Sequence, residues 1–118
     1  MSRYLALYMG TLDSAAQQEW ESLPEDEKTE RSTRAMAAWD AWVKLHAAAI
    51  TDMGAPLGKT LLASTSGISP TRNAVTAYVI VEADSHKDAA KMFENHPHFA
   101  IFPGTGVEIL ECLPMPGA

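Results

Sequence analysis

The amino-acid sequence predicts an α+β protein with the ferredoxin-like order β-α-β-β-α-β. Two observations support this class: the chain contains two β-α-β segments in tandem, and a turn-rich stretch connects them. Each crossover is expected to be right-handed, so the four strands form one antiparallel sheet with both helices on the same face. At 118 residues, the chain is expected to fold as a single domain over residues 1–118.

The first strand is predicted at Arg3–Met9, where both alternating sets of side chains are apolar, so both faces of the strand should be covered. A short helix capped by Asp13 is expected at Ser14–Glu21. The sequence Ser22–Glu25 has the spacing of a capping box with a proline in the first turn. It predicts the start of a long helix.

This long helix is expected to run to about Asp52 and to stop at Gly54, with apolar side chains at helical spacing in its last two thirds. The second strand is predicted at Lys59–Ala63. The stretch Ser64–Asn73 is rich in serine, threonine and glycine, and this composition is typical of a loop. The first half of the chain therefore supplies two strands and their crossover helix.

The second half begins with the strongest strand pattern of the chain, Ala74–Ala83, in which β-branched residues recur at alternate positions. A capping box at Ser85–Asp88 opens a helix that is expected to run to Asn95. Pro97 is expected to stop this helix, because the residue before a proline avoids the helical conformation. The last strand is predicted at Val107–Leu113.

One face of the predicted sheet has no helix to cover it. The first and third strands carry apolar residues on both sides, so this bare face is not suited to water. An exposed apolar patch of that size usually marks an interface. The simplest cover is the same face of a second copy related by a two-fold axis, so a homodimer is predicted.

Charge and composition disfavour several classes of partner. The formal net charge is −6, and the nine Lys and Arg residues form no basic run, which disfavours nucleic acid. The apolar stretch Ala35–Ile50 is interrupted by charged residues and is not expected to span a membrane. The N-terminus lacks the pattern of a signal peptide. The single cysteine, Cys112, suits a reducing compartment, so a cytoplasmic location is expected.

Three histidines are the candidate proton-transfer groups. His46 lies near the apolar side of the long helix, and His96 and His98 flank a proline, where extended chain brings alternate side chains to one side. Small shifts move a histidine pKa across neutrality, so each could act as a general base. The alternatives are a partly buried His46 bonded to a backbone carbonyl, and a solvated helix-exit loop for the other two. A metal site would need a third ligand, and no Cys or His cluster supplies one, so neither metal nor cofactor is expected.

Three aromatic residues are candidate walls of an apolar substrate pocket between the helices and the sheet: Trp39, Trp42 and Tyr78. The alternative is that they belong to the ordinary core. Arg72 is the candidate contact for an anionic substrate group, because a guanidinium binds such groups with paired hydrogen bonds. It lies in the stretch Ser64–Asn73, which is either a mobile lid or a plain solvated loop.

Several segments of the chain resemble those of one known family. They are the first strand Arg3–Met9, the helix opening Leu23–Glu27, the third strand Ala77–Asp84 with Asp88–Ala90 after it, and the last strand and tail, Gly106–Glu111 and Met115–Pro116. Together they resemble the YCII-related proteins, a group of small bacterial ferredoxin-like domains. The similarity extends over nearly the whole chain.

This resemblance implies a homodimer that forms an α+β barrel. Small members of the family carry a His–Asp pair in a cleft, proposed as catalytic; the corresponding stretch of this chain holds Trp39, Trp42 and Val43, with His46 nearby. One branch carries an Asp-Gly-Pro-Phe tetrad before the third strand, where this chain has Ser69–Asn73. Since most of the family has no established activity, the resemblance implies fold and assembly more than function.

Three classes of function follow from these residues. The first is an enzyme that performs cofactor-free acid–base chemistry on a small, partly apolar substrate, and it requires a pocket holding a histidine with a shifted pKa near a carboxylate. The second is a non-catalytic module that binds or senses a small molecule, with a pocket that lacks convergent titratable groups. The third is a homodimeric interaction subunit, with a filled cleft and a second exposed patch.

Overall fold

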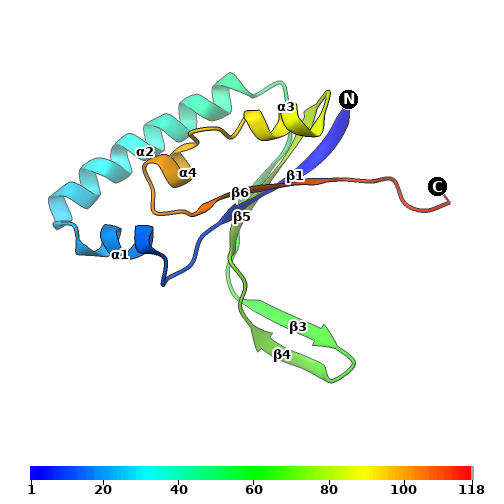
Figure 1. Cartoon of the computed structure of the whole chain (residues 1–118), viewed down its shortest axis with the longest axis horizontal. Helices are drawn as coiled ribbons and strands as arrows, with labels where there is room; N and C mark the ends of the chain where they lie inside the picture. The colour runs from blue at the N-terminus through cyan, green and yellow to red at the C-terminus, as the bar shows by residue number, and fades with distance from the viewer. Residues whose placement is uncertain (118) are drawn as a thin grey trace.

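The computed structural model describes residues 1–117 and confirms the α+β class. The main sheet has four antiparallel strands in the order β2-β5-β1-β6. Its strands are β1 (Ser2–Met9), β2 (Ile50–Pro56), β5 (Val75–Ala83) and β6 (Gly106–Glu111). The helices are α1 (Ala15–Ser22), α2 (Glu25–Leu45), α3 (His86–Lys91) and α4 (Pro97–Ala100). Figure 1 shows the helices on one side of this sheet, as the ferredoxin-like fold requires.

Strand alternation places one set of β1 side chains in the core. Tyr4, Ala6 and Tyr8 are buried on the helix side of the sheet. Across the β1–β5 ladder, Ala6 pairs with Val79 and Tyr4 with Val81, and both valines are buried as well. Each buried valine contributes about 1.5–3 kcal/mol relative to an exposed one. The helix side completes this core with Trp42, Ala89 and Phe93.

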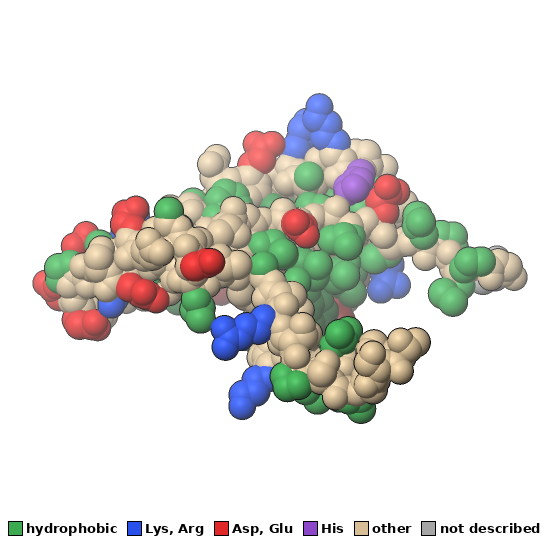
Figure 2. Space-filling model, turned by 60° about the horizontal axis from the view of Figure 1, so that its bottom comes forward, with side chains coloured by type: hydrophobic (Ala, Val, Ile, Leu, Met, Phe, Trp, Pro, Cys, Tyr) green, Lys and Arg blue, Asp and Glu red, His purple; other side chains and the backbone are tan. Residues whose placement is uncertain are grey.

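The other set of β1 side chains lies on the face that no helix covers. Leu5 pairs with Ile80 on one side and with Leu110 on the other, so three aliphatic side chains form a row across the sheet. Leu110 is 41% exposed. Figure 2 shows hydrophobic side chains gathered in the middle of the molecule, and acidic side chains at the end where α1 meets α2.

The first helix begins one residue later than its predicted cap implies. Ser14, and not Asp13, is the N-cap of α1, because the Ser14 hydroxyl accepts a hydrogen bond from the Gln17 backbone N–H at 3.0 Å. This bond satisfies one of the four N–H groups that a helix leaves unpaired at its start. The prediction of a short helix here is confirmed, and the prediction of its cap is wrong.

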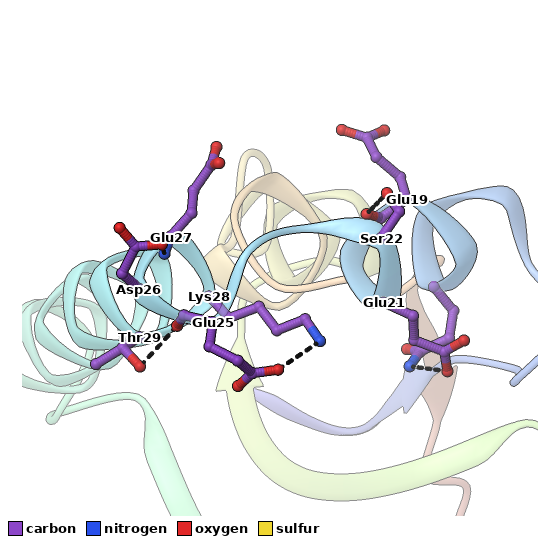
Figure 3. Close-up of polar contacts among 9 residues, drawn as sticks. Glu19, Glu21, Ser22, Glu25, Asp26, Glu27, Lys28 and Thr29 are labelled. Carbon is purple, nitrogen blue, oxygen red and sulfur yellow. Dashed lines mark hydrogen bonds and ion pairs between the residues drawn. The ribbon is translucent and has the colours of Figure 1, made fainter.

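The predicted capping box at the start of α2 is also wrong. The Ser22 hydroxyl donates to the Glu19 carbonyl at 2.7 Å, so Ser22 completes α1 and does not open α2 (Figure 3). Pro24 is the N-cap of α2 and makes no side-chain cap bond. The N-terminus of α2 is stabilised instead by the acidic side chains of its first turn, whose negative charge interacts favourably with the positive end of the helix dipole. Glu25 also forms an ion pair with Lys28 at 3.3 Å.

Helix α2 ends at Leu45, seven residues before the predicted end at Asp52. The chain turns at His46, whose carbonyl accepts from Ala49 and Ile50, and Ile50 then pairs with Val81 in the sheet. The helix propensity of the alanines here is overridden by strand pairing with β5. In the stretch from residue 1 to residue 117, no helix is long and apolar enough to cross a membrane.

Gly54 lies inside β2 and does not stop a helix. Its φ is +69°, and a Cβ at this position would overlap the carbonyl group of Tyr78. Only glycine allows the backbones of β2 and β5 to approach this closely with that conformation. The second strand of the sheet is therefore Ile50–Pro56, and the prediction that it is Lys59–Ala63 is wrong.

The predicted strand Lys59–Ala63 belongs to a separate hairpin instead. Strand β3 (Thr60–Ser64) pairs with β4 (Gly67–Thr71), and the two form a sheet of their own. The stretch Ser64–Asn73, which was predicted to be a loop, thus contains a strand. Figure 1 shows this hairpin projecting away from the main sheet. Pro70 is tolerated because a two-stranded ribbon has only edge strands.

The second crossover confirms one predicted cap and changes the role of a proline. The Ser85 hydroxyl accepts from the Asp88 N–H at 3.0 Å and caps α3, as predicted. Helix α3 ends at Lys91, four residues before the predicted end at Asn95, and the chain turns again at Asn95, where φ is +56°. Pro97 does not simply stop α3, because it is the first residue of α4, with His96 as the N-cap.

Candidate functional site

A cavity of about 490 Å³ opens between α2 and the β2–β5 edge of the sheet. Its walls are mostly apolar and come from segments far apart in the sequence. The side of the sheet supplies Tyr8, Ile50, Pro56, Ala77 and Val79; the helix side supplies Met36, Trp39, Trp42, Val43, His98 and Phe102. An apolar hollow of this volume with a few polar groups is typical of a small-molecule site.

The aromatic side chains at the inner end of this cavity pack on one another. The rings of Tyr8 and Trp39 have centroids 5.0 Å apart, and Trp39 also meets Phe102 edge-on at 6.3 Å. Trp42 is 8% exposed, and its indole N–H donates to the Met92 carbonyl at 2.7 Å. This bond fixes Trp42 between α2 and the end of α3. The cavity therefore has flat, rigid walls that suit a flat ligand.

His98 is held in place by the end of β1. Its Nε2 lies 2.7 Å from the Met9 carbonyl, which can only accept, so Nε2 carries the proton and donates. The same carbonyl accepts from the Thr105 N–H at 2.9 Å. In the neutral ring, Nδ1 then keeps a free lone pair. Burial lowers the pKa of His98, and the bond to Met9 partly opposes this by favouring the charged form.

Gly104 makes room for His98. A Cβ at Gly104 would overlap the imidazole ring, and the Gly104 N–H donates to the His98 carbonyl at 2.9 Å. The turn after α4 therefore approaches the ring so closely that a side chain does not fit. This contact and the Met9 bond fix the ring from two sides.

His96 is fully buried behind the cavity wall. Its ring meets Trp39 edge-on at 4.5 Å and Trp42 at 4.7 Å. Its Nδ1 accepts from the His98 backbone N–H at 3.0 Å, and its Nε2 lies 3.3 Å from the Tyr8 hydroxyl. Burial, followed by the nearby His98 and His46, lowers the pKa of His96 to about 3, so the ring is neutral at pH 7. Burial also raises the pKa of Tyr8.

The structure brings together four of the residues that the sequence singled out. Trp39, Trp42 and His98 line the cavity, and His96 lies directly behind it. His46 lies at the end of α2, where its ring packs on Trp42 at 5.0 Å without lining the cavity.

Arg72 lies apart from this group, whereas Tyr78 is among the residues that line the cavity. Arg72 stands at the foot of the hairpin, where it lines a separate open hollow together with Lys59 and Asp13. Tyr78 borders the cavity, but strand alternation directs its ring to the face opposite Ala77, which is the side where Leu7 pairs with it. No anion contact from Arg72 therefore reaches the cavity in this arrangement.

Sequence reasoning did not single out Tyr8 as a site residue. It identified the hydroxyls of Tyr4, Tyr8 and Tyr78 as groups that need partners when buried, and a strand-face tyrosine as a reasonable ligand contact. The available signal was the inward face of the first strand, since Tyr8 shares that face with Tyr4 and Ala6. Its actual partner is 88 positions away in the sequence, so no local pattern could reveal the contact.

The cavity lacks the carboxylate that the enzyme hypothesis expected beside the histidine. All of its lining residues are apolar, neutral polar or histidine, and within the described chain no Asp or Glu is among them. Nor does any group of three or more His, Cys, Asp or Glu side chains among residues 1–117 have an arrangement that could hold a metal ion. The polar side chains at the cavity, apart from the indoles, are thus those of Tyr8, Thr76, Tyr78 and His98, with His96 behind the wall.

The fold is shared with a structurally characterised enzyme. No family model matches this chain, and no curated protein sequence does. A solved structure that is similar is 5-chloro-2-hydroxyhydroquinone dehydrochlorinase (TftG) from Burkholderia phenoliruptrix AC1100, in complex with 2,5-dihydroxybenzoquinone. The two chains are 18% identical, the match covers 94% of this chain and 93% of that one, and the TM-score is 0.51. At this identity, the similarity shows the fold alone.

Proposed function

We propose that this protein is an enzyme that performs acid–base chemistry with its own side chains on a small, largely apolar molecule bound in the cavity. The observation that carries the proposal is the position of His98, a buried neutral imidazole in the wall of an otherwise apolar hollow. A neutral histidine with a free lone pair is a general base at neutral pH. The aromatic walls favour a flat, ring-shaped substrate.

The chemistry follows from the hydrogen bonds of His98. Because Nε2–H donates to Met9, the lone pair is on Nδ1, and Nδ1 is the atom that takes a proton from a substrate O–H or from a C–H beside a carbonyl. The substrate keeps the electron pair and becomes an oxyanion or an enolate, while the ring becomes an imidazolium that the Met9 carbonyl stabilises. Return of the proton to another substrate atom isomerises it; departure of a leaving group with its electron pair completes an elimination.

The structural comparison supports this choice of substrate class. TftG carries the same fold and is a dehydrochlorinase in complex with a dihydroxybenzoquinone. A flat oxygenated ring of that kind is a suitable occupant for a cavity of about 490 Å³ with indole and phenol walls. With the resemblance of the strands, it also supports membership of the YCII-related family.

A binding module is the second candidate, and one observation favours it. No acidic side chain lines the described cavity, so His98 has no carboxylate to hold its charged form. Such a cavity could retain a small ring compound without converting it. A measurement of substrate conversion distinguishes the two candidates, because only an enzyme converts the bound compound.

The protein is also proposed to form a homodimer through the uncovered face of the sheet. The row of Leu5, Ile80 and Leu110 across this face supports the proposal, since burial of aliphatic side chains against a second copy is favourable. The YCII-like resemblance implies the same assembly. Sedimentation at micromolar concentration that shows only monomer would contradict it.

The experiment that tests the proposed activity compares wild type with two histidine variants. His98→Gln keeps an N–H that can donate to Met9 but removes the basic lone pair. His86→Gln is the matched control, because His86 bonds to the Ile109 carbonyl and does not line the cavity. The probes are 2,5-dihydroxybenzoquinone for binding, by calorimetry, and chlorinated hydroquinones for turnover, with products separated by chromatography.

Wild type and His86→Gln are expected to bind the quinone and to convert at least one hydroquinone. His98→Gln is expected to bind similarly and to convert it about 10²–10⁴-fold more slowly, the usual contribution of a general base. Equal turnover by His98→Gln would refute the assignment of the base. Binding without any turnover by the wild type would favour the binding module.

A further inference from the structure

We infer that the Tyr8 hydroxyl donates a hydrogen bond to an acceptor oxygen of the bound molecule, and that His96 is the residue that directs it there. This inference deepens the proposed function and rests on it. It adds a substrate requirement that the apolar walls alone do not impose: an oxygen with a free lone pair on the flat ring.

The first step concerns the proton of His96. The backbone N–H of His98 can only donate, and it points at His96 Nδ1 over 3.0 Å. Nδ1 must therefore carry a lone pair, because a proton there would face the proton of the amide. A neutral imidazole holds one ring proton, so that proton is on Nε2. The backbone thus fixes the tautomer of a ring that is fully buried.

The second step concerns the proton of Tyr8. With Nε2 protonated, His96 is the donor in the 3.3 Å contact, and the Tyr8 oxygen accepts. The hydroxyl proton of Tyr8 is then left without an acceptor, since the contact with His96 is the only hydrogen bond of this hydroxyl among residues 1–117. Tyr8 is 3% exposed, so bulk water does not readily take this role. A buried donor without an acceptor is unfavourable.

The third step is the location. Tyr8 lines the cavity from the side of the sheet, with its ring 5.0 Å from that of Trp39 and 5.2 Å from that of His98, so a ligand in the cavity is the available acceptor. The raised pKa of Tyr8 keeps its proton in place at neutral pH, and the hydroxyl therefore acts as a donor and not as a base. His98 and Tyr8 then have complementary roles: one accepts a proton from the ligand, and the other stabilises the oxygen where negative charge develops.

This arrangement selects for a chemical class. A carbonyl, phenolate or enolate oxygen satisfies the Tyr8 donor, whereas a hydrocarbon of the same shape leaves it unpaired. Sites that are built to bond a polar group discriminate strongly against analogues that lack it. The cavity should therefore prefer an oxygenated aromatic or quinoid ring to the corresponding hydrocarbon.

The test uses two variants and two probes. Tyr8→Phe removes the donor, and Tyr4→Phe is the matched control, because Tyr4 is buried on the same face of β1 but does not line the cavity. The probes are 2,5-dihydroxybenzoquinone, which offers acceptor oxygens, and p-xylene, which offers none. Calorimetry gives the affinity of each protein for each probe, and nitrogen NMR of the histidine rings reads the tautomer of His96.

The expected result is specific to one variant and one probe. Tyr8→Phe should bind the quinone about 10-fold or more weakly, the equivalent of one hydrogen bond to an anionic oxygen. Its affinity for p-xylene should remain within about twofold of wild type, as should both affinities of Tyr4→Phe. The nitrogen spectrum should show His96 protonated at Nε2 only.

The unfavourable outcomes are distinguishable. Wild-type protein that binds neither probe would overturn the proposed function, and the role of Tyr8 with it. Wild-type protein that binds the quinone, while Tyr8→Phe binds it equally well, would overturn the role of Tyr8 alone. A His96 ring protonated at Nδ1 would overturn the directing role of His96, whatever the binding data show.

Discussion

Replacement of Gly104 by alanine tests how His98 is held in place. The added methyl group would overlap the imidazole ring, and the backbone of this turn is tied to the His98 carbonyl. Two relaxations are open to the structure. If the ring swings away from Gly104, its bond to the Met9 carbonyl breaks; if the turn moves outward, the bond from the Gly104 N–H to the His98 carbonyl breaks.

The magnitude can be estimated from these losses. The broken hydrogen bond costs about 1 kcal/mol, and forcing extra volume into a packed region costs about 1–3 kcal/mol. Alanine recovers roughly 0.4–1 kcal/mol by restricting the unfolded chain. The net destabilisation of Gly104→Ala is therefore about 1–3.5 kcal/mol, which lowers the melting temperature by about 4–15 °C for a domain of this size.

Gly58→Ala is the matched control, because a Cβ at Gly58 has no atom within 4 Å. Its melting temperature should equal that of wild type or rise slightly. Thermal unfolding of the three proteins gives the comparison, and an NMR titration follows His98. If the ring swings out in Gly104→Ala, the pKa of His98 should rise toward its ordinary value, because the loss of burial, the larger effect, outweighs the loss of the Met9 bond. If Gly104→Ala has the same melting temperature as Gly58→Ala and the pKa of His98 is unchanged, the steric argument is refuted.

Two further predictions concern pH and assembly. The pKa of His96 is about 3 in the folded protein and 6.5 in the unfolded chain. Between these two pH values the unfolded chain binds a proton that the folded protein does not. The free energy of unfolding therefore falls as the pH drops below 6.5. Thermal unfolding should show a loss of about 2 kcal/mol from this residue between pH 7 and pH 5, and His96→Asn, which retains a capping oxygen, should show a smaller loss. Leu5→Glu puts a charge between Ile80 and Leu110 and should yield monomer in sedimentation, whereas Leu61→Glu, on the exposed hairpin, should not.

Each of these has an outcome that would count against it. An equal loss of stability on acidification in wild type and His96→Asn would show that other groups control the acid response. A Leu5→Glu protein that sediments as a dimer would place the interface elsewhere. A Leu61→Glu protein that sediments as a monomer would move it to the hairpin.

Much of the sheet could be predicted from the sequence, because its strands carry local signals. The first strand, the strand at Val75–Ala83 and the last strand are confirmed within a few residues by their alternating patterns. The cap at Ser85 is confirmed for the same reason, since a hydroxyl and the N–H three residues later form a short-range contact. Signals that act over one turn or one strand can be read from the chain directly.

The second strand and the hairpin could not be predicted in this way. Residues 47–49 are alanines with high helix propensity, and only pairing with β5 draws the following residues into the sheet. Lys59–Ala63 has a strand pattern, and it is a strand, but its partner is β4 and not the sheet. A strand pattern predicts the conformation of a segment, whereas its partner depends on the register and on long-range contacts.

In the candidate site, too, local signals could be predicted from the sequence and long-range contacts could not. The sequence identified His96 and His98 because they flank a proline, and the proline explains why their roles differ. Pro97 begins α4 and leaves His96 outside the helix as its cap, with Nδ1 turned to the amide of His98. His98, one residue into the helix beyond Pro97, turns instead to Met9. Contacts with β1 complete both positions, and these contacts are beyond the reach of a local pattern.

This arrangement also determines how many protons the segment can hold. Protonation of His96 at Nδ1 would oppose the amide proton of His98, and burial already holds the pKa of His96 near 3. A charge on His96 would also lie next to His98 and weaken it as a base. Because the backbone keeps His96 neutral, a proton that enters the site can be carried only by His98, where the Met9 carbonyl stabilises the charged ring. The neutrality of the buried histidine is therefore a condition for the proposed basicity of its neighbour.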